Sequence, residues 1–193
     1  MPEHDALAER GRALEEEYFR RKDRELIERM RRADRDEAAQ REMGAATGIT
    51  DPALLAELQA LGFTPETVRL LPFVPIVQVA WAEGGVADAE RYTLMSLAHA
   101  RGIAEGTPAE RQLAAWLDAP PDPQVFASAT RLIRAVLETP THDPSMLSAD
   151  QLVSYCEQIA SASGGFFGLG WVSADERKLL ESIASGLKNR DAR

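Results

Sequence analysis

Two stretches of the chain repeat each other and decide its fold. The first reads Gln78-Val79-Ala80-Trp81-Ala82-Glu83-Gly84-Gly85, and the second reads Gln158-Ile159-Ala160-Ser161-Ala162-Ser163-Gly164-Gly165. The second copy then carries six additional residues, 166–171, before the match resumes at Val86 and Val172. Small residues before the glycines allow close approach of helices, and glycine adopts backbone angles that other residues avoid. Each copy therefore predicts a helix, a tight turn and a second helix.

Helix start signals recur outside the repeat. Asp51-Pro52, Thr64-Pro65, Thr107-Pro108 and Asp122-Pro123 each place an N-cap residue before a proline at the first helical position. Thr107, Ser148 and Ser173 open capping boxes that end in Glu110, Gln151 and Glu176. The helix that starts at Asp51 is expected to run to Gly62, and the one that starts at Thr64 to end before Pro72. The helix that starts at Asp122 is expected to run to about Glu138.

The most apolar stretch, residues 70–82, is predicted to be a buried helix with Pro75 in its first turn. Its β-branched residues also suit a strand, but a lone strand would have no partner. The prediction is an all-α fold: a bundle of two duplicated helical hairpins that pack face to face, closed by the intervening helices.

The first residues form a region of different character. Residues 3–42 hold 13 acidic and 11 basic side chains, a net charge of −2 that leaves −7 for the rest of a chain of net charge −9. Neither Gly nor Pro lies between Arg12 and Met43. Acidic and basic residues four apart stabilise a helix surface by about 0.2–0.5 kcal/mol a pair, and four pairs stand in the favourable order: 16–20, 17–21, 25–29 and 28–32. A long charged helix is predicted, with 1–43 as an N-terminal arm and 44–193 as the helical domain.

A narrow apolar stripe runs along this predicted helix. It consists of Leu14, Tyr18, Leu26 and Met30, with Phe19 and Ile27 beside them. The stripe either packs the helix on its own domain or pairs the arm with a second chain. The heptads are too few to predict a coiled coil.

Composition excludes several classes of protein. The chain has 193 residues, 45% of them hydrophobic and 27% charged, which fits a globular protein. Its acidic balance gives no general attraction for nucleic acid or anionic lipid, so no nucleic-acid partner is expected. A single cysteine cannot form an internal disulfide. The charged start does not fit a signal peptide and the longest apolar run is too short to cross a bilayer, so a cytoplasmic location is expected.

At the repeats the chain resembles the TerB-like superfamily, which includes the tellurite-resistance protein TerB. The shared signature is a helix ending in Ala-Asp-Gly, a hydrophobe and an acidic helix start. It is carried here by residues 81–86 with Glu90-Arg91, and in a degenerate form by residues 163–165 with Val172 and Glu176-Arg177. The resemblance covers roughly residues 71–187 and implies about seven core helices, a stress-response or scaffolding role, and metal binding at the acidic turns. The Asp of the family turn is Glu83 in one copy and Ser163 in the other.

Acidic residues of the first turn are the candidate metal ligands. Glu83, Asp88 and Glu90 offer carboxylate oxygens of the kind that Ca²⁺ and Mg²⁺ prefer. Their spacing does not fit an EF-hand loop. The alternative is that the acidic residues complement the positive end of the helix dipole, which needs no cofactor.

The six-residue insertion is the candidate contact loop. It contains Phe166, Phe167 and Trp171 among glycines, and it lacks the Lys-Ser or Lys-Thr of a phosphate loop. The aromatic residues either tuck under the core or stay exposed to touch a partner or a membrane surface. Cys156 lies among apolar residues and is predicted to be a buried small hydrophobe rather than a nucleophile. No histidine stands at metal spacing or in a hydrolase motif.

Three functional hypotheses follow from these residues. The leading one is a non-enzymatic interaction or scaffold module that contacts a protein partner, or a second copy of itself, through Tyr18 and Leu26 of the arm and through Phe166, Phe167 and Trp171. The second is a metal-dependent hydrolase in which the two turns converge, so that Asp175 and Glu176 join Glu83, Asp88 and Glu90 at one ion. The third is an inhibitory arm that blocks another enzyme.

Overall fold

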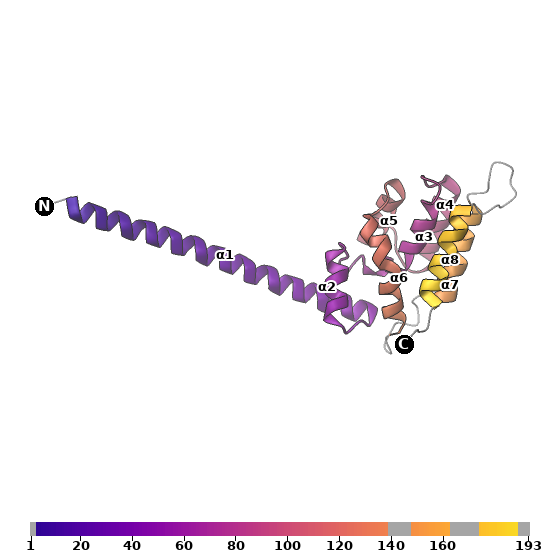
Figure 1. Cartoon of the computed structure of the whole chain (residues 1–193), viewed down its shortest axis with the longest axis horizontal. Coiled ribbons are helices and arrows are strands. Elements are labelled where there is room, and N and C mark those ends of the chain that lie inside the picture. Colours follow the sequence, from indigo (N-terminus) through magenta and orange to yellow (C-terminus); the bar gives the residue numbers. More distant parts are fainter. Residues whose placement is uncertain (1–2, 139–147, 163–173, 189–193) are drawn as a thin grey trace. The chain divides into compact units, whose positions relative to one another are not determined.

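A computed structural model describes residues 3–138, 148–162 and 174–188, with side chains at 15–138, 148–162 and 177–187. Throughout these ranges the regular structure is helical, without strands (Figure 1). The all-α prediction is therefore confirmed. The elements, in chain order, are α1 (Glu3–Thr47), α2 (Pro52–Ala60), the 3₁₀ helix η1 (Val68–Phe73), α3 (Val74–Ala80), α4 (Asp88–Ala100), α5 (Pro108–Asp118), α6 (Pro123–Leu137), α7 (Ala149–Ala162) and α8 (Ala174–Lys188).

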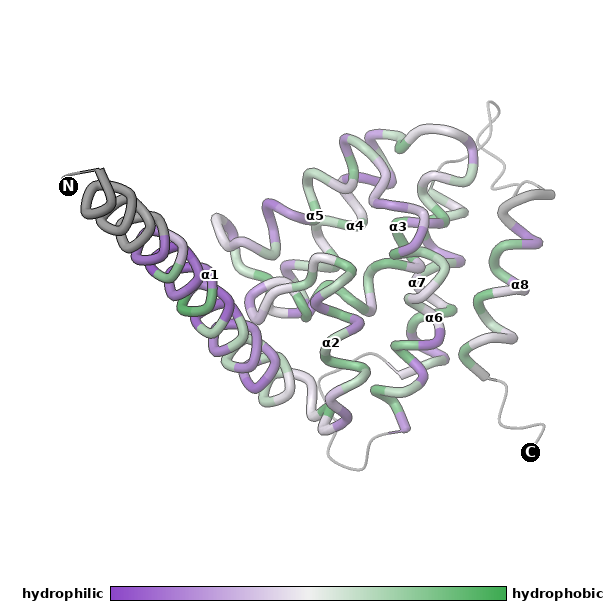
Figure 2. The backbone as a smooth tube through the Cα atoms, turned by 60° about the vertical axis from the view of Figure 1, so that its left-hand side comes forward, coloured by the Kyte–Doolittle hydropathy of each residue, from purple (hydrophilic) through white to green (hydrophobic). Residues whose placement is uncertain are grey.

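The chain divides into two compact units, residues 1–41 and 42–193. The first, here called the arm, is helical and consists of the part of α1 before residue 42. Hydrophilic residues predominate along the coloured part of the arm in Figure 2, interrupted by hydrophobic bands. Every buried hydrophobic side chain among the described residues lies at Met43 or beyond, in the second unit, here called the bundle.

Helix α3 is the centre of the bundle. All of its residues except Gln78 are buried, and it packs against η1, α4, α6, α7 and α8. A helix that is apolar on every side must be covered on every side. The predicted buried helix with Pro75 in its first turn is confirmed over Val74–Ala80, whereas residues 70–73 of the predicted range belong to the 3₁₀ helix η1 and residues 81 and 82 follow the end of α3.

The entry into α3 differs from the prediction of a helix after Thr64-Pro65. Residues 64–67 form a turn, in which the Thr67 amide donates to the Thr64 carbonyl at 3.0 Å and the Thr64 amide donates to the Thr67 hydroxyl at 2.9 Å. The helical segment begins only at Val68, is a 3₁₀ helix, and includes Pro72 instead of ending before it. A proline lacks an amide donor and disfavours the α conformation of the residue before it, so the chain reaches α3 through this tighter helix.

The predicted caps are present at helix starts. The Asp51, Thr107 and Asp122 side chains accept backbone amides of α2, α5 and α6 at 2.8, 3.2 and 2.8 Å. Ser148 and Gln151 form the reciprocal bonds of a capping box at 3.0 and 3.2 Å. Ser173 lies outside the described residues.

Both copies of the repeat place their helices together. Helix α7 of the second copy packs on α3 and α4 of the first, and α8 packs on α7 and α3. The turn of the second copy falls within residues 163–173, outside the described ranges. The duplicated hairpin therefore stays a prediction in its details.

The end of α1 is fixed inside the bundle by local bonds. The buried Thr47 hydroxyl donates to the Met43 carbonyl at 2.8 Å, and the Ile49 amide donates to that hydroxyl at 3.3 Å. Gly48 has a φ of +76°, which turns the chain back. A Cβ added at Gly44 would lie 2.8 Å from the Ile49 carbonyl oxygen, so this position has no room for a side chain.

We expect Gly44→Ala to lower the free energy of unfolding by about 1–2 kcal/mol, because overpacking outweighs the gain in helix propensity. Urea denaturation of the full chain measures the change. The control is Gly85→Ala, where an added Cβ meets nothing within 4 Å and the change should stay within about 0.5 kcal/mol. Equal stability of the two variants would contradict the steric argument.

Candidate functional site

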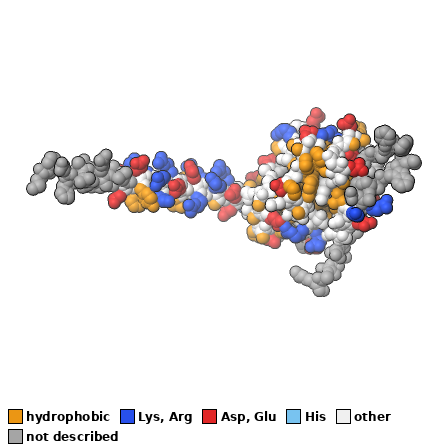
Figure 3. All heavy atoms as spheres, turned by 45° about the horizontal axis from the view of Figure 1, so that its top comes forward, with side chains coloured by type: hydrophobic (Ala, Val, Ile, Leu, Met, Phe, Trp, Pro, Cys, Tyr) orange, Lys and Arg blue, Asp and Glu red, His pale blue; other side chains and the backbone are white. Residues whose placement is uncertain are grey.

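The arm carries five large hydrophobic side chains that are 46–62% exposed. Hydrophobic side chains gather along one edge of its described part (Figure 3). Phe19, Leu26 and Met30 are spaced i, i+7 and i+11, so they share one side of a helix, and Tyr18 and Ile27 flank them. We call these five residues the apolar face. The predicted contact residues Tyr18 and Leu26 both belong to it.

The N-terminal end of the apolar face is an aromatic cluster. The Tyr18 and Phe19 rings meet edge to face with centroids 5.8 Å apart. Arg21 and Lys22 lie over the Tyr18 ring at 5.7 and 5.8 Å from its centroid. These cation–π contacts use groups within the same helix, and both aromatic side chains stay exposed.

The predicted charge pairs along the arm form only in part. Arg20 and Glu16 are 3.4 Å apart, with both side chains mostly exposed. Lys22 pairs instead with Glu25, three residues on, at 3.2 Å. The 17–21, 25–29 and 28–32 pairs make no ion pair among the described side chains. An exposed ion pair contributes little to the free energy of folding because solvent screens the two charges. Long charged side chains therefore need not adopt the paired conformation.

The first repeat turn has a structural role. Gly84 takes a φ of +85° between α3 and α4, and its amide donates to the Trp81 carbonyl at 2.9 Å. Glu90 is only 2% exposed, and its Oε2 accepts the Ala87 amide at 2.7 Å. This bond does the work of a cap, which Ala87 cannot supply from its own side chain.

The two sides of this turn bind the C-terminal end of α5. The Trp81 indole Nε1 donates to the Trp116 carbonyl at 2.8 Å. The Arg91 Nη2 donates to the Leu117 carbonyl at 2.7 Å and to Asp118 Oδ1 at 2.7 Å. The last carbonyls of a helix have no partners within it and carry partial negative charge. Trp81 and Arg91 therefore complete α5 and hold it to the turn.

The predicted metal ligands are not gathered at one point. Glu83 and Asp88 are exposed, whereas Glu90 is buried and bonded to its own helix start. Within the described ranges no group of three His, Cys, Asp or Glu side chains is placed to hold a metal ion. The side chains of Asp175 and Glu176 lie outside those ranges, as do Phe166, Phe167 and Trp171, so the convergence of the two turns and the contact loop stay predictions.

Cys156 is buried, as predicted, and is not disulfide-bonded. Burial, with a smaller contribution from the charge of Glu157, raises the pKa of its thiol to about 12. A thiol of this kind stays protonated at neutral pH and is a poor nucleophile.

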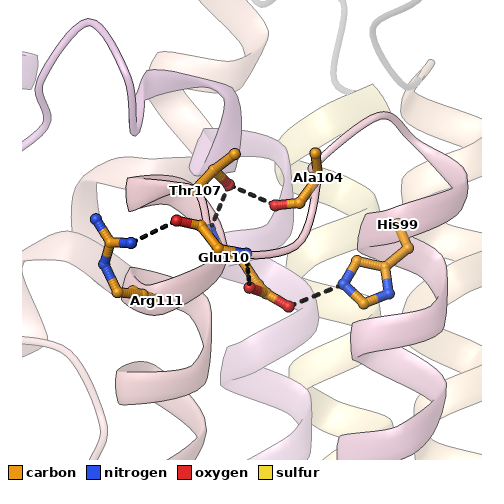
Figure 4. A network of polar contacts seen from close by, with 6 residues as sticks. His99, Ala104, Thr107, Glu110 and Arg111 are labelled. Carbon is orange, nitrogen blue, oxygen red and sulfur yellow. Dashed lines mark hydrogen bonds and ion pairs between the residues drawn. The ribbon is translucent and has the colours of Figure 1, made fainter.

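A polar network joins the end of α4 to the start of α5 (Figure 4). Glu110 accepts the Gly106 amide at 2.6 Å and lies 3.0 Å from His99 Nε2. The Thr107 hydroxyl donates to the Ala104 carbonyl at 2.7 Å, and Arg111 donates to the Gly106 carbonyl. The Gly106 bond, and then the His99 bond, hold the pKa of Glu110 below its ordinary value. Hydrogen bonding to the charged form is the cause.

Sequence reasoning missed the contacts between distant residues. Arg101 donates to the Tyr155 hydroxyl at 2.7 Å and lies 5.4 Å from the ring centroid. Arg131 pairs with Glu57 across α6 and α2. No local pattern marks such partners, whereas the capping-box spacing of Thr107 and Glu110 did mark the start of the network around His99.

Comparison of the chain with protein-family models, curated proteins and solved structures finds no match in any of the three. The resemblance to the TerB-like superfamily therefore stays a prediction. As for membranes, the described helices include none with both the length and the apolarity that a span requires.

We expect Arg91→Met to lower the free energy of unfolding by about 1–2 kcal/mol, because the α5 carbonyls lose a charged donor while the aliphatic stem is kept. Chemical denaturation provides the measurement. Arg69→Met is the matched control, since it removes the same charge from an exposed side chain. A loss as large in the control would assign the effect to net charge.

The lowered pKa of Glu110 predicts a pH dependence. A carboxylate whose pKa is lower in the folded state contributes stability above its unfolded pKa, and this is lost as pH falls through the folded pKa. We therefore expect Glu110→Gln to be less stable than the parent at neutral pH, with the difference shrinking in acid below the ordinary Glu pKa of about 4.3. Denaturation midpoints across this range test it. Glu105→Gln, an exposed neighbour, should show no such trend, and a constant difference for Glu110→Gln would refute the assignment.

Proposed function

We propose that the chain is a non-enzymatic helical interaction module whose arm docks a protein partner through the apolar face. The observation that carries the proposal is the exposure of five large hydrophobic side chains on one helix between residues 18 and 30. Amphipathic helices bind grooves through apolar anchors at this kind of spacing.

The grouping of these five side chains within one short stretch of helix supports a contact surface. Single exposed hydrophobic residues are ordinary and carry no argument. In the described part of the bundle, Tyr92 is the one large hydrophobic side chain that is exposed, at 76%. The arm holds the other five, and its remaining described side chains up to Glu37 are exposed and mostly charged.

The length of the apolar face favours a groove over a coiled coil. Its members cover about two heptads, whereas a coiled coil is predicted from three to four. Asp23 lies on the same side of the helix between Phe19 and Leu26, which interrupts a continuous seam. A short, well-packed groove in a protein partner would bury the face without requiring further repeats. Self-association is the second outcome that the experiment below distinguishes.

The other predictions stand beside this proposal. A scaffolding or stress-related role of the TerB-like type, in the cytoplasm, would suit an interaction module and has no support beyond the resemblance. The metal-dependent hydrolase is not favoured by the described residues, because Glu90 is already engaged by the Ala87 amide.

The test replaces two anchors of the apolar face. We expect Leu26→Ser with Met30→Ser to abolish capture of the partner by the full chain from its source cells, because the buried apolar area is lost. Arg24→Ser with Glu28→Ser is the matched control. It also introduces two serines four residues apart at exposed positions, it removes no apolar side chain, and it leaves the net charge unchanged.

Two further measurements decide the outcome. Circular dichroism must show equal helix content in both variants, and sedimentation of the parent chain separates a foreign partner from a second copy. Capture that survives in the Leu26→Ser, Met30→Ser variant, or that is lost equally in the control, would show that the apolar face is not the docking surface.

A further inference from the structure

Arginines that alternate with acidic residues along the sequence of the arm come together on one side of its helix. Six arginines, all exposed, line another side of the arm, four of them at successive spacings of four, seven and four residues. At 3.6 residues per turn, their mean direction is about 155° from that of the apolar face. Basic side chains are prominent along the described part of the arm in Figure 3. We call this set the arginine face: Arg20, Arg24, Arg31 and Arg35, with Arg21 and Arg32 beside them.

Most of the arginine face has no acidic partner. Arg20 pairs with Glu16 at 3.4 Å, and the Arg35 Nε donates to the Arg31 carbonyl at 3.2 Å. Among the side chains that the structure describes, Arg24 and Arg32 make no ion pair, and Arg31 makes none either. Glu28 is the acidic residue that lies within the set between Arg20 and Arg35. A positive stripe about 22 Å long, from a rise of 1.5 Å per residue, is therefore available to an anion.

We propose that the arginine face binds the phosphate backbone of a nucleic acid. The guanidinium group is planar, always charged, and matches phosphate oxygens with two parallel donors. A strand of a duplex presents a phosphate every 3.4 Å along its axis, so a linear row of arginines meets several of them. Contacts to the backbone carry no sequence information, so the binding is sequence-independent.

The apolar side of the arm is too short and too interrupted to favour a membrane surface. A helix that lies on a bilayer buries a large apolar side and keeps its basic residues on the opposite, polar side. In the arm the apolar face covers only about two heptads, and Asp23 lies within it. An ordinary protein interface also needs apolar anchors at its centre, and the arginine face holds none.

The chain's net charge of −9 does not oppose this local contact. Charges separated by more than about 8–10 Å are largely screened at physiological salt. The expectation of no nucleic-acid partner follows from the total charge of the chain. Between Arg20 and Arg35 the helix leaves Glu28 as the one acidic side chain among these arginines, so the argument from the total does not apply to this face.

The experiment measures fluorescence anisotropy of short labelled duplex and single-stranded oligonucleotides with the full chain over a range of salt concentrations. We expect saturable binding at low salt. The variant Arg24→Gln, Arg31→Gln, Arg35→Gln should weaken it by at least about tenfold and reduce the salt slope by about 3. The control Lys22→Gln, Arg29→Gln, Arg41→Gln removes the same charge from the same helix off the arginine face, and its loss should be several-fold smaller.

Three results would overturn the proposal: no binding to either oligonucleotide at low salt, equal losses in variant and control, or competition by polyglutamate as strong as by unlabelled oligonucleotide. Preference for phosphatidylglycerol vesicles over the oligonucleotide would overturn it as well. The Leu26→Ser, Met30→Ser variant should bind the oligonucleotide as the parent does, so this proposal and protein docking by the apolar face fail independently.

Discussion

The bundle depends on one constraint: the apolar segment from Val68 to Ala80 must be kept out of water. This segment is apolar on nearly every side, and no single neighbouring helix can cover it. Helices α4, α6, α7 and α8 surround α3, and each brings its own apolar side to that centre. The amphipathic pattern of the outer helices follows from this arrangement, because each has one side on the core and one in water.

Covering a short central helix leaves the polar ends of its neighbours to be satisfied. The bundle meets this need at the α5 terminus with side chains from the far side of a turn, Trp81 and Arg91. In the sequence, the acidic residues of that turn suggest a cation site. In the structure, Glu83 and Asp88 are exposed to solvent, whereas Glu90 forms a hydrogen bond at the start of α4. Glu90 in particular is buried and accepts a backbone amide there, since a buried carboxylate without a hydrogen-bond donor would be costly.

The sequence predicts what local chemistry determines. The caps at Asp51, Thr107 and Asp122, the buried helix around Pro75 and the absence of strands from the described ranges all follow from short-range patterns. The contacts of Arg101 with Tyr155 and of Arg91 with α5 do not, because their partners are set by packing of helices distant in sequence. Of the candidate site, the apolar face was predictable from its spacing. The arginine face is not evident in the sequence, because its arginines alternate with acidic residues along the chain and line up only around the helix.

The positions of the tryptophans give the two units separate optical signals. All three, at residues 81, 116 and 171, lie outside the arm, and the indole of Trp81 donates to the backbone carbonyl of Trp116. Tryptophan emission, excited at wavelengths that tyrosine does not absorb, therefore reports on the bundle alone, whereas ellipticity sums the helices of both units. A gap between the two melting curves would measure the autonomy of the arm directly, without a label or a truncation.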